Sequence, residues 1–372
     1  MPRSLARYLL PAAVFQGVIV GGGYGTGREV VEYVSRHGPA GGVVASVVIA
    51  MAFSAVLAVS FMLAVRFRVH DYRHFLKLLL GRAWWIYELL FVTLLVIVLA
   101  VVGSAAGTAL ADGFGLPYAP GVACVLGAVL VLNYFGRTLV ERALGTWTVL
   151  LMTGLAAFVL TVLTTSPTFP PGAAGVPFAP LAAARSGLQF AVYNSALIPV
   201  LVYCVAHLER GSEACTAGVL AGLGGALPAF LLHLCFMSRY PAVVEQPIPT
   251  WWLLEAMGAE AFLPLYFIVL AGTIVLTAVG VLQGVNERLD GWREDRGRPP
   301  LSRPAHALIA AALVAASLVL ARFGIVDLVA RGYGALAWGF LFVFTLPLLT
   351  RGILLIQNQG DSSCPERSSA AR

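Results

Sequence analysis

Two clusters of residues in this sequence of 372 residues have the types and spacing needed to bind a small polar molecule or an ion. The first, Gly21 to Gly27, holds five glycines in seven residues and is followed by Arg28 and Glu29. The second is the polar triplet Tyr193-Asn194-Ser195, which Pro199 follows. Because each glycine costs about 1 kcal/mol against alanine in a helix and proline removes a helix hydrogen bond, both clusters predict interrupted helices. Backbone amides and carbonyls freed at such a break can bind a ligand or an ion.

Further candidates are polar side chains within otherwise apolar runs, where a charge is expensive and usually functional. Arg28 and Glu29 point about 100° apart on a helix, so they cannot share one partner. Three roles are open for Glu29: binding a cation, carrying a proton, or neutralising Arg28. Thr273 and Thr277 lie one turn apart on one helix face. Their hydroxyls either coordinate a cation or bond to the preceding turn of their own helix.

The composition shows what kind of protein must position these residues. Apolar residues make up 59% of the chain and charged residues 11%, against roughly 25% charged residues in an ordinary soluble domain. The mean hydropathy is +0.86. This excludes a cytosolic enzyme, a disordered chain and a nucleic-acid-binding domain, and it predicts a multi-span α-helical membrane protein. The net charge of +6 is typical of lysines and arginines held in cytoplasmic loops.

Ten apolar segments are long enough to cross a membrane, since about 20 residues span its hydrocarbon core. With the N-terminus in the cytoplasm, most of the 24 lysines and arginines fall in cytoplasmic segments. This distribution favours an even number of spans, with both termini in the cytoplasm. We place the spans at roughly 8–35, 41–65, 83–111, 118–135, 140–165, 187–206, 213–238, 261–286, 304–322 and 328–356.

The two predicted breaks occupy matching places in the two halves of the chain. One break lies in the first span of the half that covers residues 8–166, and the other lies in the first span of the half that covers residues 186–356. A polar cytoplasmic tail, 357–372, follows the second half. Interrupted spans at corresponding places in two five-span halves are the best sequence sign of an inverted-repeat transporter. Two loops also have structure of their own: residues 70–81 predict an amphipathic helix on the inner membrane surface, and residues 239–260 an outer loop that can act as a lid.

The five cysteines form no C-x-x-C pair, so we interpret them as apolar packing residues and expect no metal site. His70 and His74 are four residues apart, but no further ligands cluster near them, so this pair also reads as part of a surface helix.

Three stretches of the sequence resemble YkvI-like bacterial membrane proteins: GGGYGTGREVVEYVSRHGPAGG, QFAVYNSALIPVL and HDYRHF. The layout of five plus five spans, with breaks in spans 1 and 6, resembles the LeuT fold of the amino acid–polyamine–organocation superfamily. The resemblance covers nearly the whole chain. It implies an all-α, polytopic protein of about ten helices in a bacterial cytoplasmic (inner) membrane, related in its two halves by an inverted repeat.

The resemblance also implies roles for several residues. Arg28 lies where many LeuT-fold transporters place an outer-gate arginine, and Asp327, at the outer start of span 10, is its expected acidic partner. The alternative is that both are solvated at the membrane interface. In sodium-coupled relatives, hydroxyls on span 8 and carbonyls from the span 1 break hold a sodium ion. Here Val20, Gly21 and Thr277 would supply that site, with Thr273 one turn away.

The coupling ion stays open between sodium and a proton. The resemblance leads us to expect two consecutive hydroxyls on span 8, but Leu276 and Ala278 flank Thr277. Some sodium-independent relatives use a lysine on span 5, and span 5 here has none. In the proton-coupled version, Glu29 is the titrating group.

Together these features favour a secondary active transporter that works by alternating access, with a small amino acid or a related zwitterion or amine as substrate. Break amides suit a carboxylate, while carbonyls and Asn194 suit an ammonium group. A transporter-like sensor or accessory protein is the alternative. A membrane-embedded enzyme is less favoured, because no His, Asp and Cys cluster is visible. We expect no cofactor beyond the coupling ion. The predicted substrate-binding residues are Gly21, Gly22, Gly23, Tyr24, Gly25, Thr26, Ser104, Tyr193, Asn194 and Ser195.

Overall fold

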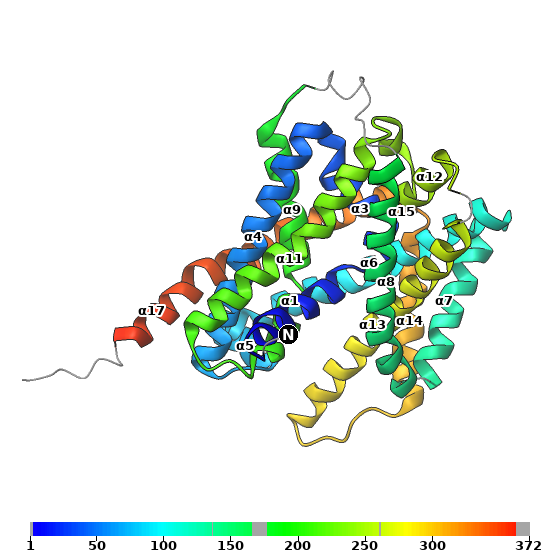
Figure 1. Ribbon diagram of the computed structural model, residues 1–372. Helices are drawn as coiled ribbons and strands as arrows, with labels where there is room; N and C mark the ends of the chain where they lie inside the picture. Colours follow the sequence, from blue (N-terminus) through cyan, green and yellow to red (C-terminus); the bar gives the residue numbers. More distant parts are fainter. Residues whose placement is uncertain (1–2, 136, 166–176, 260–261, 362–372) are drawn as a thin grey trace, which may run out of the picture.

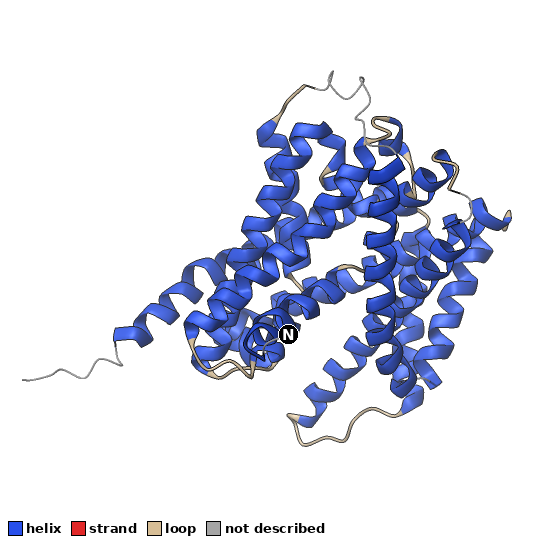
Figure 2. Ribbon diagram, in the orientation of Figure 1, coloured by secondary structure: helices blue, strands red, loops and turns tan. Residues whose placement is uncertain are grey.

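The computed structural model describes residues 3–135, 137–165, 177–259 and 262–361, and every regular element in these ranges is a helix (Figures 1 and 2). Six helices are long and apolar enough to cross a membrane, and a bent pair makes a seventh span. Three shorter apolar helices lie at 7–19, 118–134 and 149–165. The described residues therefore agree with the ten predicted spans. The predicted end of the first half, residue 166, and most of the tail, 362–372, lie outside the described residues.

The first span is interrupted, as its glycines predict. It consists of α1 (Arg3–Ile19), the single turn α2 (Gly22–Gly25) and α3 (Arg28–Tyr33). The chain leaves helical geometry on both sides of α2, and Gly27 adopts the left-handed conformation with φ of 78°. That conformation is open to glycine at little cost, so the glycine run allows two sharp changes of direction within a few residues.

The sixth span is also interrupted, and it begins earlier than the sequence indicates. α9 (Pro180–Ser195) is followed by α10 (Ile198–Leu201) and the 3-10 turn η4 (Val202–Val205), bent by 45° from α9. Its start at Pro180 corrects the predicted start at residue 187. The apolar pattern there is broken by Arg185, whose guanidinium lies over the ring of Trp338 at 5.1 Å.

The remaining spans are mostly continuous helices. The surface helix α5 (Tyr72–Leu80) buries Phe75, Leu76 and Leu79 and begins at Asp71, whose side chain accepts a hydrogen bond from the amide of His74. The loop at residues 239–260 contains α12 (Pro249–Ala256). Span 10 begins with α15 (Gly324–Asp327) and the π-helical turn η7 (Leu328–Tyr333). It continues through α16 (Gly334–Phe340) to α17 (Ile353–Asp361). α17 thus carries the helix past the predicted tail start at residue 357. The other spans are α4 (Gly38–Phe67), α6 (Trp84–Phe114), α7 (Tyr118–Phe135), α8 (Arg137–Thr165), α11 (Gly211–Met237), α13 (Leu263–Glu294) and α14 (Arg303–Ala321).

The helices pack in two sets. α4 packs on α9 and α11, and α11 also packs on α1. In the second set, α6 and α7 pack on each other and on both α13 and α14, and α8 packs on α13 (Figure 1). α1 of the first interrupted span and α9 of the sixth thus belong to the first set, whereas the single turn α2 contacts α6 and α13 of the second set. In a membrane, close helix packing relies on small residues rather than on the hydrophobic effect. Gly218 and Gly222 of α11 lie directly against the α4 backbone.

We predict that Gly218→Ala weakens the contact between α4 and α11. A Cβ at residue 218 would lie 2.5 Å from the Cα of Ala58, which is backbone and cannot move aside. Overpacking of this kind costs about 2 kcal/mol, so the unfolding temperature in detergent should fall. Gly224→Ala on the same helix is the control, because its Cβ would sit 3.7 Å from the Cβ of Ala12. Equal melting temperatures for the two variants would contradict this packing.

Candidate functional site

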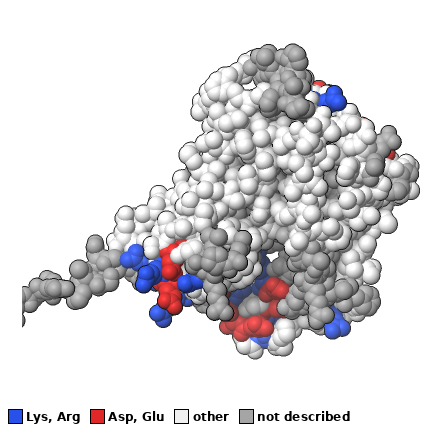
Figure 3. All heavy atoms as spheres, viewed as in Figure 1, with Lys and Arg blue, Asp and Glu red and all other residues white. Residues whose placement is uncertain are grey.

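A cavity of about 620 Å³ lies where the two interrupted spans face the second set of helices. Its deep end is formed by Gly21, Glu29, Tyr193 and Asn194, which come from the two breaks, together with Tyr333 of span 10. Its walls are mainly apolar. Its mouth carries the charged residues of α5 and of the end of α13, namely Asp71, Arg73, His74, Glu287, Arg288 and Asp295. In Figure 3 charged side chains gather around a hollow at the lower end of the molecule, below a broad region without charge.

Glu29 and Tyr193 join the two breaks at the deep end of the cavity. Glu29 is 6% exposed, and the hydroxyl of Tyr193 donates a short hydrogen bond to its Oε2 atom. The ring of Tyr193 stacks on Tyr333, with 4.7 Å between ring centroids. A buried carboxylate needs hydrogen-bond donors or a cation. The two breaks therefore place a carboxylate, held by one phenol, at the wall of a cavity large enough for a small molecule.

Asn194 and Ser195 end α9 with their side chains turned back on their own helix. The Asn194 amide donates to the carbonyl of Phe190 at 3.0 Å, and the Ser195 hydroxyl donates to the carbonyl of Ala191 at 2.7 Å. Asn194 lines the cavity, whereas Ser195 is not among the described residues that line it. Of the predicted triplet, Tyr193 and Asn194 are therefore placed to meet a ligand.

The outer part of the span 1 break faces away from the cavity. The carbonyl of Gly25 accepts hydrogen bonds from Thr250 and Tyr266, at 3.1 and 2.9 Å, and that of Thr26 accepts from Thr250 at 2.9 Å. Tyr24 is buried and lines a separate apolar pocket of about 100 Å³. Tyr24, Gly25 and Thr26 are not among the described residues that line this cavity, and their contact with a substrate stays a prediction.

Gly22 and Gly23 form the first half of α2, directly after the cavity residue Gly21. Ser104, also predicted at the site, lies among α6, α7 and α14, with its hydroxyl 2.7 Å from that of Tyr118. It is not among the described residues that line the cavity. A role for Ser104 in substrate binding stays a prediction.

The predicted ion ligands are partly brought together. Val20, Gly21 and Thr277 all line the cavity, and a Cβ added to Gly21 would lie 3.2 Å from the Thr277 hydroxyl oxygen. The Thr273 hydroxyl donates to the carbonyl of Val269 at 2.7 Å and accepts from the indole of Trp147 at 3.1 Å. Thr277 thus lies against the span 1 break. Thr273 also lines the cavity, but its hydroxyl is hydrogen-bonded to its own helix and to Trp147 of α8. No group of three or more His, Cys, Asp or Glu residues that could hold a metal occurs in the described ranges.

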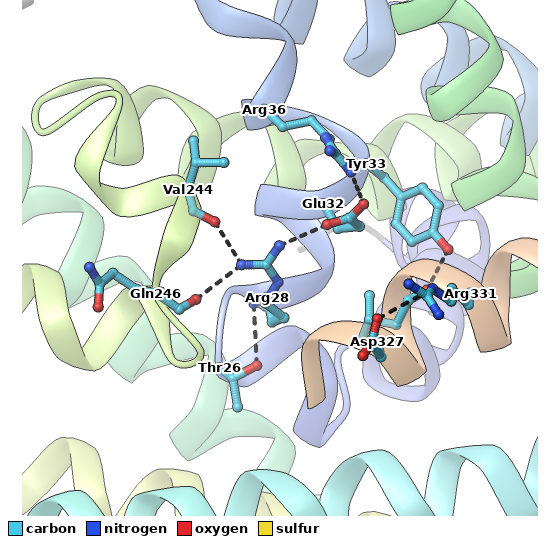
Figure 4. Close-up of polar contacts among 10 residues, drawn as sticks. Thr26, Arg28, Glu32, Tyr33, Arg36, Val244, Gln246, Asp327 and Arg331 are labelled. Atoms are coloured by element: carbon cyan, nitrogen blue, oxygen red, sulfur yellow. Dashed lines mark hydrogen bonds and ion pairs between the residues drawn. The ribbon is translucent and has the colours of Figure 1, made fainter. Parts of the chain in front are cut away.

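The side of the break that faces the loop at residues 239–260 is held by a network around Arg28 (Figure 4). Its guanidinium donates to Glu32 at 2.7 Å and to the carbonyls of Val244 and Gln246, in the outer loop, at 2.8 and 3.1 Å. The Tyr33 hydroxyl donates to the carbonyl of Val329 in span 10 at 2.8 Å. The half-helix α3 is thereby tied to both the outer loop and span 10.

Arg28 does not pair with Asp327 in this structure, contrary to the prediction. Its buried acidic partner is Glu32, one turn along α3, and Glu32 also pairs with Arg36. Asp327 instead pairs with Arg331 on its own helix, at 3.4 Å, with both side chains more than half exposed. Glu32 lies one helical turn from Arg28, so its carboxylate reaches the guanidinium without any movement of the backbone. This proximity explains why Arg28 pairs with Glu32.

Three residues at or near the cavity escaped the sequence analysis. Tyr333 lies between Gly332 and Gly334, and this local glycine pair, in a π-helical turn, is a signal that could have indicated it. Trp147 and Phe91 line the cavity within apolar helices. Nothing in their sequence surroundings separates them from aromatic residues that simply face lipid.

No protein-family model and no curated protein sequence matches the chain. Among solved structures, the fold is similar to that of MhsT in complex with L-phenylalanine, with a TM-score of 0.63, 17% identity, and coverage of 96% of this chain and 98% of that one. The manganese transporter of Eremococcus coleocola gives a TM-score of 0.49 with 16% identity, over 98% of this chain and 89% of that one. The chain therefore has the all-helical LeuT-type fold with interrupted spans 1 and 6. Membership among YkvI-like proteins stays a prediction.

We predict that Glu32→Gln destabilises the protein far more than Asp327→Asn. The side chains of Arg28 and Glu32 are 4% and 9% exposed, and breaking a buried pair by removing one partner costs about 3 kcal/mol. The exposed pair of Asp327 and Arg331 should contribute only about 0.5 kcal/mol. Thermal unfolding in detergent compares the two variants. A larger loss for Asp327→Asn would show that Arg28 depends on Asp327 after all.

Proposed function

We propose that this chain is a secondary active transporter of a small amino acid or a related zwitterion or amine, working by alternating access in a bacterial cytoplasmic membrane. The observation that carries the proposal is the meeting of the two breaks, where Tyr193 donates to the buried Glu29 at the deep end of the cavity. Breaks of this kind at membrane depth are the usual substrate and ion sites of transporters. The fold similarity to MhsT over nearly the whole chain supports it.

The substrate we favour is an amino acid with an apolar side chain. Glu29 and the carbonyl oxygen of Asn194 suit an ammonium group, and the backbone of the span 1 break after Gly21 suits the carboxylate. The wall of the cavity is mainly apolar and includes Leu95 and Leu276, which suit an apolar side chain. The solved structure of MhsT, which shares the fold, contains L-phenylalanine, and we propose the same substrate class here.

The conformation matches one of the two end states of an alternating-access cycle, in which the cavity is open to one side of the membrane. The cavity reaches the surface at α5 and at the end of α13, on the side that the arginine and lysine distribution assigns to the cytoplasm. On the opposite side, Arg28 and Tyr33 tie α3 to the outer loop and to span 10. We infer an inward-facing state. The outward-facing state requires these contacts to open.

A sensor or accessory protein that binds the same ligand without moving it is the second candidate. Uptake of radiolabelled L-phenylalanine, L-leucine and phenethylamine into vesicles that contain the purified protein separates the two. Uptake above that of empty vesicles supports transport. Ligand-dependent thermal stabilisation without uptake supports sensing, and neither effect for any of the three compounds contradicts the proposed site.

We expect Tyr193→Phe to weaken substrate binding without disrupting the fold. The ring that stacks on Tyr333 remains, but the hydroxyl that donates to Glu29 is lost. A hydrogen bond to a charged group contributes roughly 1.5–3 kcal/mol, so KM for uptake should rise about tenfold. Tyr203→Phe is the matched control, because Tyr203 is exposed and does not line the cavity. An unchanged KM in Tyr193→Phe would remove Tyr193 from the site.

Uptake driven by a sodium gradient alone and by a proton gradient alone separates the two coupling ions. If sodium couples, Thr277→Ala should raise the sodium concentration for half-maximal uptake about tenfold, because it removes one oxygen ligand worth roughly 1.4 kcal/mol. If protons couple, Glu29→Gln should abolish proton-driven uptake.

The controls for this experiment are Thr153→Ala, an exposed threonine that bonds to its own helix at 2.8 Å, and Glu255→Gln, an exposed carboxylate on α12. If neither gradient drives uptake and neither site variant has an effect, both coupling assignments are wrong.

A further inference from the structure

Arg288, on the cytoplasmic half of α13, is a charged residue of the cavity with no role in the site described above. Its guanidinium carbon lies 3.6 Å from the ring centroid of Phe91 and 4.3 Å from that of Tyr72. Its Nη1 atom is buried without a hydrogen-bond partner, and no hydrogen bond from its side chain occurs within the described part of the chain. A guanidinium has five N–H donors, so most of its capacity is unused here.

A buried guanidinium nitrogen without a hydrogen bond is costly and calls for an explanation. Glu88 interacts with it electrostatically but forms no ion pair with it among the described residues, and Oε2 of Glu88 is itself buried without a partner. Stacking on aromatic rings offsets part of the cost, but it leaves the donors at the edge of the guanidinium plane unsatisfied. These donors suit an anion that binds reversibly.

Other charged residues at the cavity mouth are already paired. Arg73 forms an ion pair with Asp295 and donates to the carbonyls of Gly291 and Arg288 at 3.1 and 3.3 Å. This hydrogen bond from Arg73 holds the pKa of Asp295 below its usual range, so Asp295 stays ionised. His74 contacts Asp71 at 2.8 Å. Arg288 therefore remains as an arginine that lines the cavity and has donors to spare.

The position of Arg288 separates it from the deep site. It lies eleven residues after Thr277 on the same helix, which is about 16 Å along the axis. The backbone of Arg288 therefore lies nearer the cavity mouth than Thr277, which contacts the span 1 break. The cavity thus has a carboxylate at its deep end and a guanidinium nearer its mouth, joined by an apolar wall that includes Leu94 and Val98.

We propose that Arg288 forms an anion-binding subsite in the inner vestibule, which receives the carboxylate of a substrate after it leaves the site at Glu29. This inference rests on the proposed transport function for its physiological meaning. The flanking rings of Phe91 and Tyr72 favour a carboxylate attached to an apolar group over a small hydrated anion. Because a guanidinium binds a carboxylate through two parallel hydrogen bonds, the subsite selects for charge and for shape.

Binding of benzoate to the purified protein tests the subsite without any need for transport. Benzoate should raise the unfolding temperature of the native protein, whereas benzamide and benzylamine, of similar shape but without the negative charge, should not. Arg288→Gln should weaken benzoate binding at least about tenfold, and Arg288→Lys should lose less than Arg288→Gln. Arg296→Gln is the matched control, because Arg296 also stacks on an aromatic ring, Trp292 at 3.9 Å, but is exposed and outside the cavity.

Three results would overturn the subsite: no stabilisation of the native protein by benzoate, equal binding to Arg288→Gln, or equal stabilisation by benzamide. Stabilisation by inorganic phosphate but not by benzoate would instead indicate a phosphate site, as for a lipid headgroup, and would also contradict the proposal. If no amino acid is transported but benzoate binding depends on Arg288, the subsite stands and the transport function fails. If transport occurs, substrate efflux from the cytoplasmic side should require a higher substrate concentration in Arg288→Gln than in Arg296→Gln.

Discussion

Backbone groups that leave a helix inside a membrane must find hydrogen-bond partners within the protein, and the arrangement of this molecule depends on that constraint. At the span 1 break, Thr250 and Tyr266 satisfy the carbonyl of Gly25. At the span 6 break, the hydroxyl of Tyr87 donates to the carbonyl of Ala196. These donors come from the outer loop, span 8 and span 3. If spans 1 and 6 are to move relative to these elements, the hydrogen bonds at the breaks must therefore open.

The same constraint gives Arg28 and Glu29, the two adjacent charged residues of span 1, different hydrogen-bond partners. Arg28 and Glu29 are adjacent and point in different directions, so one faces the outer loop and the other faces the cavity. Nη1 and Nη2 of Arg28 donate to two backbone carbonyls and to Glu32, which ties α3 to the loop at residues 239–260. Glu29 has the phenol of Tyr193 as its donor, which leaves a carboxylate that can respond to an ammonium group, a sodium ion or a proton.

Small residues keep the set of helices that carries both breaks together. Gly187, Gly218 and Gly222 bring α9 and α11 into direct contact with the α4 backbone. The cavity between the two sets is lined mostly by larger side chains, such as Phe91, Leu94 and Trp147. Tight packing within the first set and an open space at the boundary with the second set suit a motion in which each set moves largely as a unit. The π-helical turn at Tyr333, where span 10 meets Tyr33 and Tyr193, lies on that boundary.

The amino-acid sequence by itself determined the class of structure and the positions of both breaks. These are local effects: apolar runs of sufficient length form membrane helices, the glycines at 21–27 interrupt the first span, and Pro199 follows the interruption of the sixth. It also identified Glu29, Tyr193 and Asn194 as polar residues at those breaks. The early start of α9 was missed because Arg185 breaks the apolar pattern on which the prediction relied.

Only the tertiary structure decided which way each of these residues faces. Within the glycine run, Gly21 lines the cavity, while the carbonyls of Gly25 and Thr26 turn towards Thr250 in the loop at residues 239–260. Arg28 pairs with the nearby Glu32 and not with Asp327. Ser104 accepts a hydrogen bond from Tyr118, and the stack of Tyr193 on Tyr333 joins residues 140 positions apart in the sequence. Such directions and pairings depend on which helices come into contact, and the local rules of propensity and hydropathy do not contain that information.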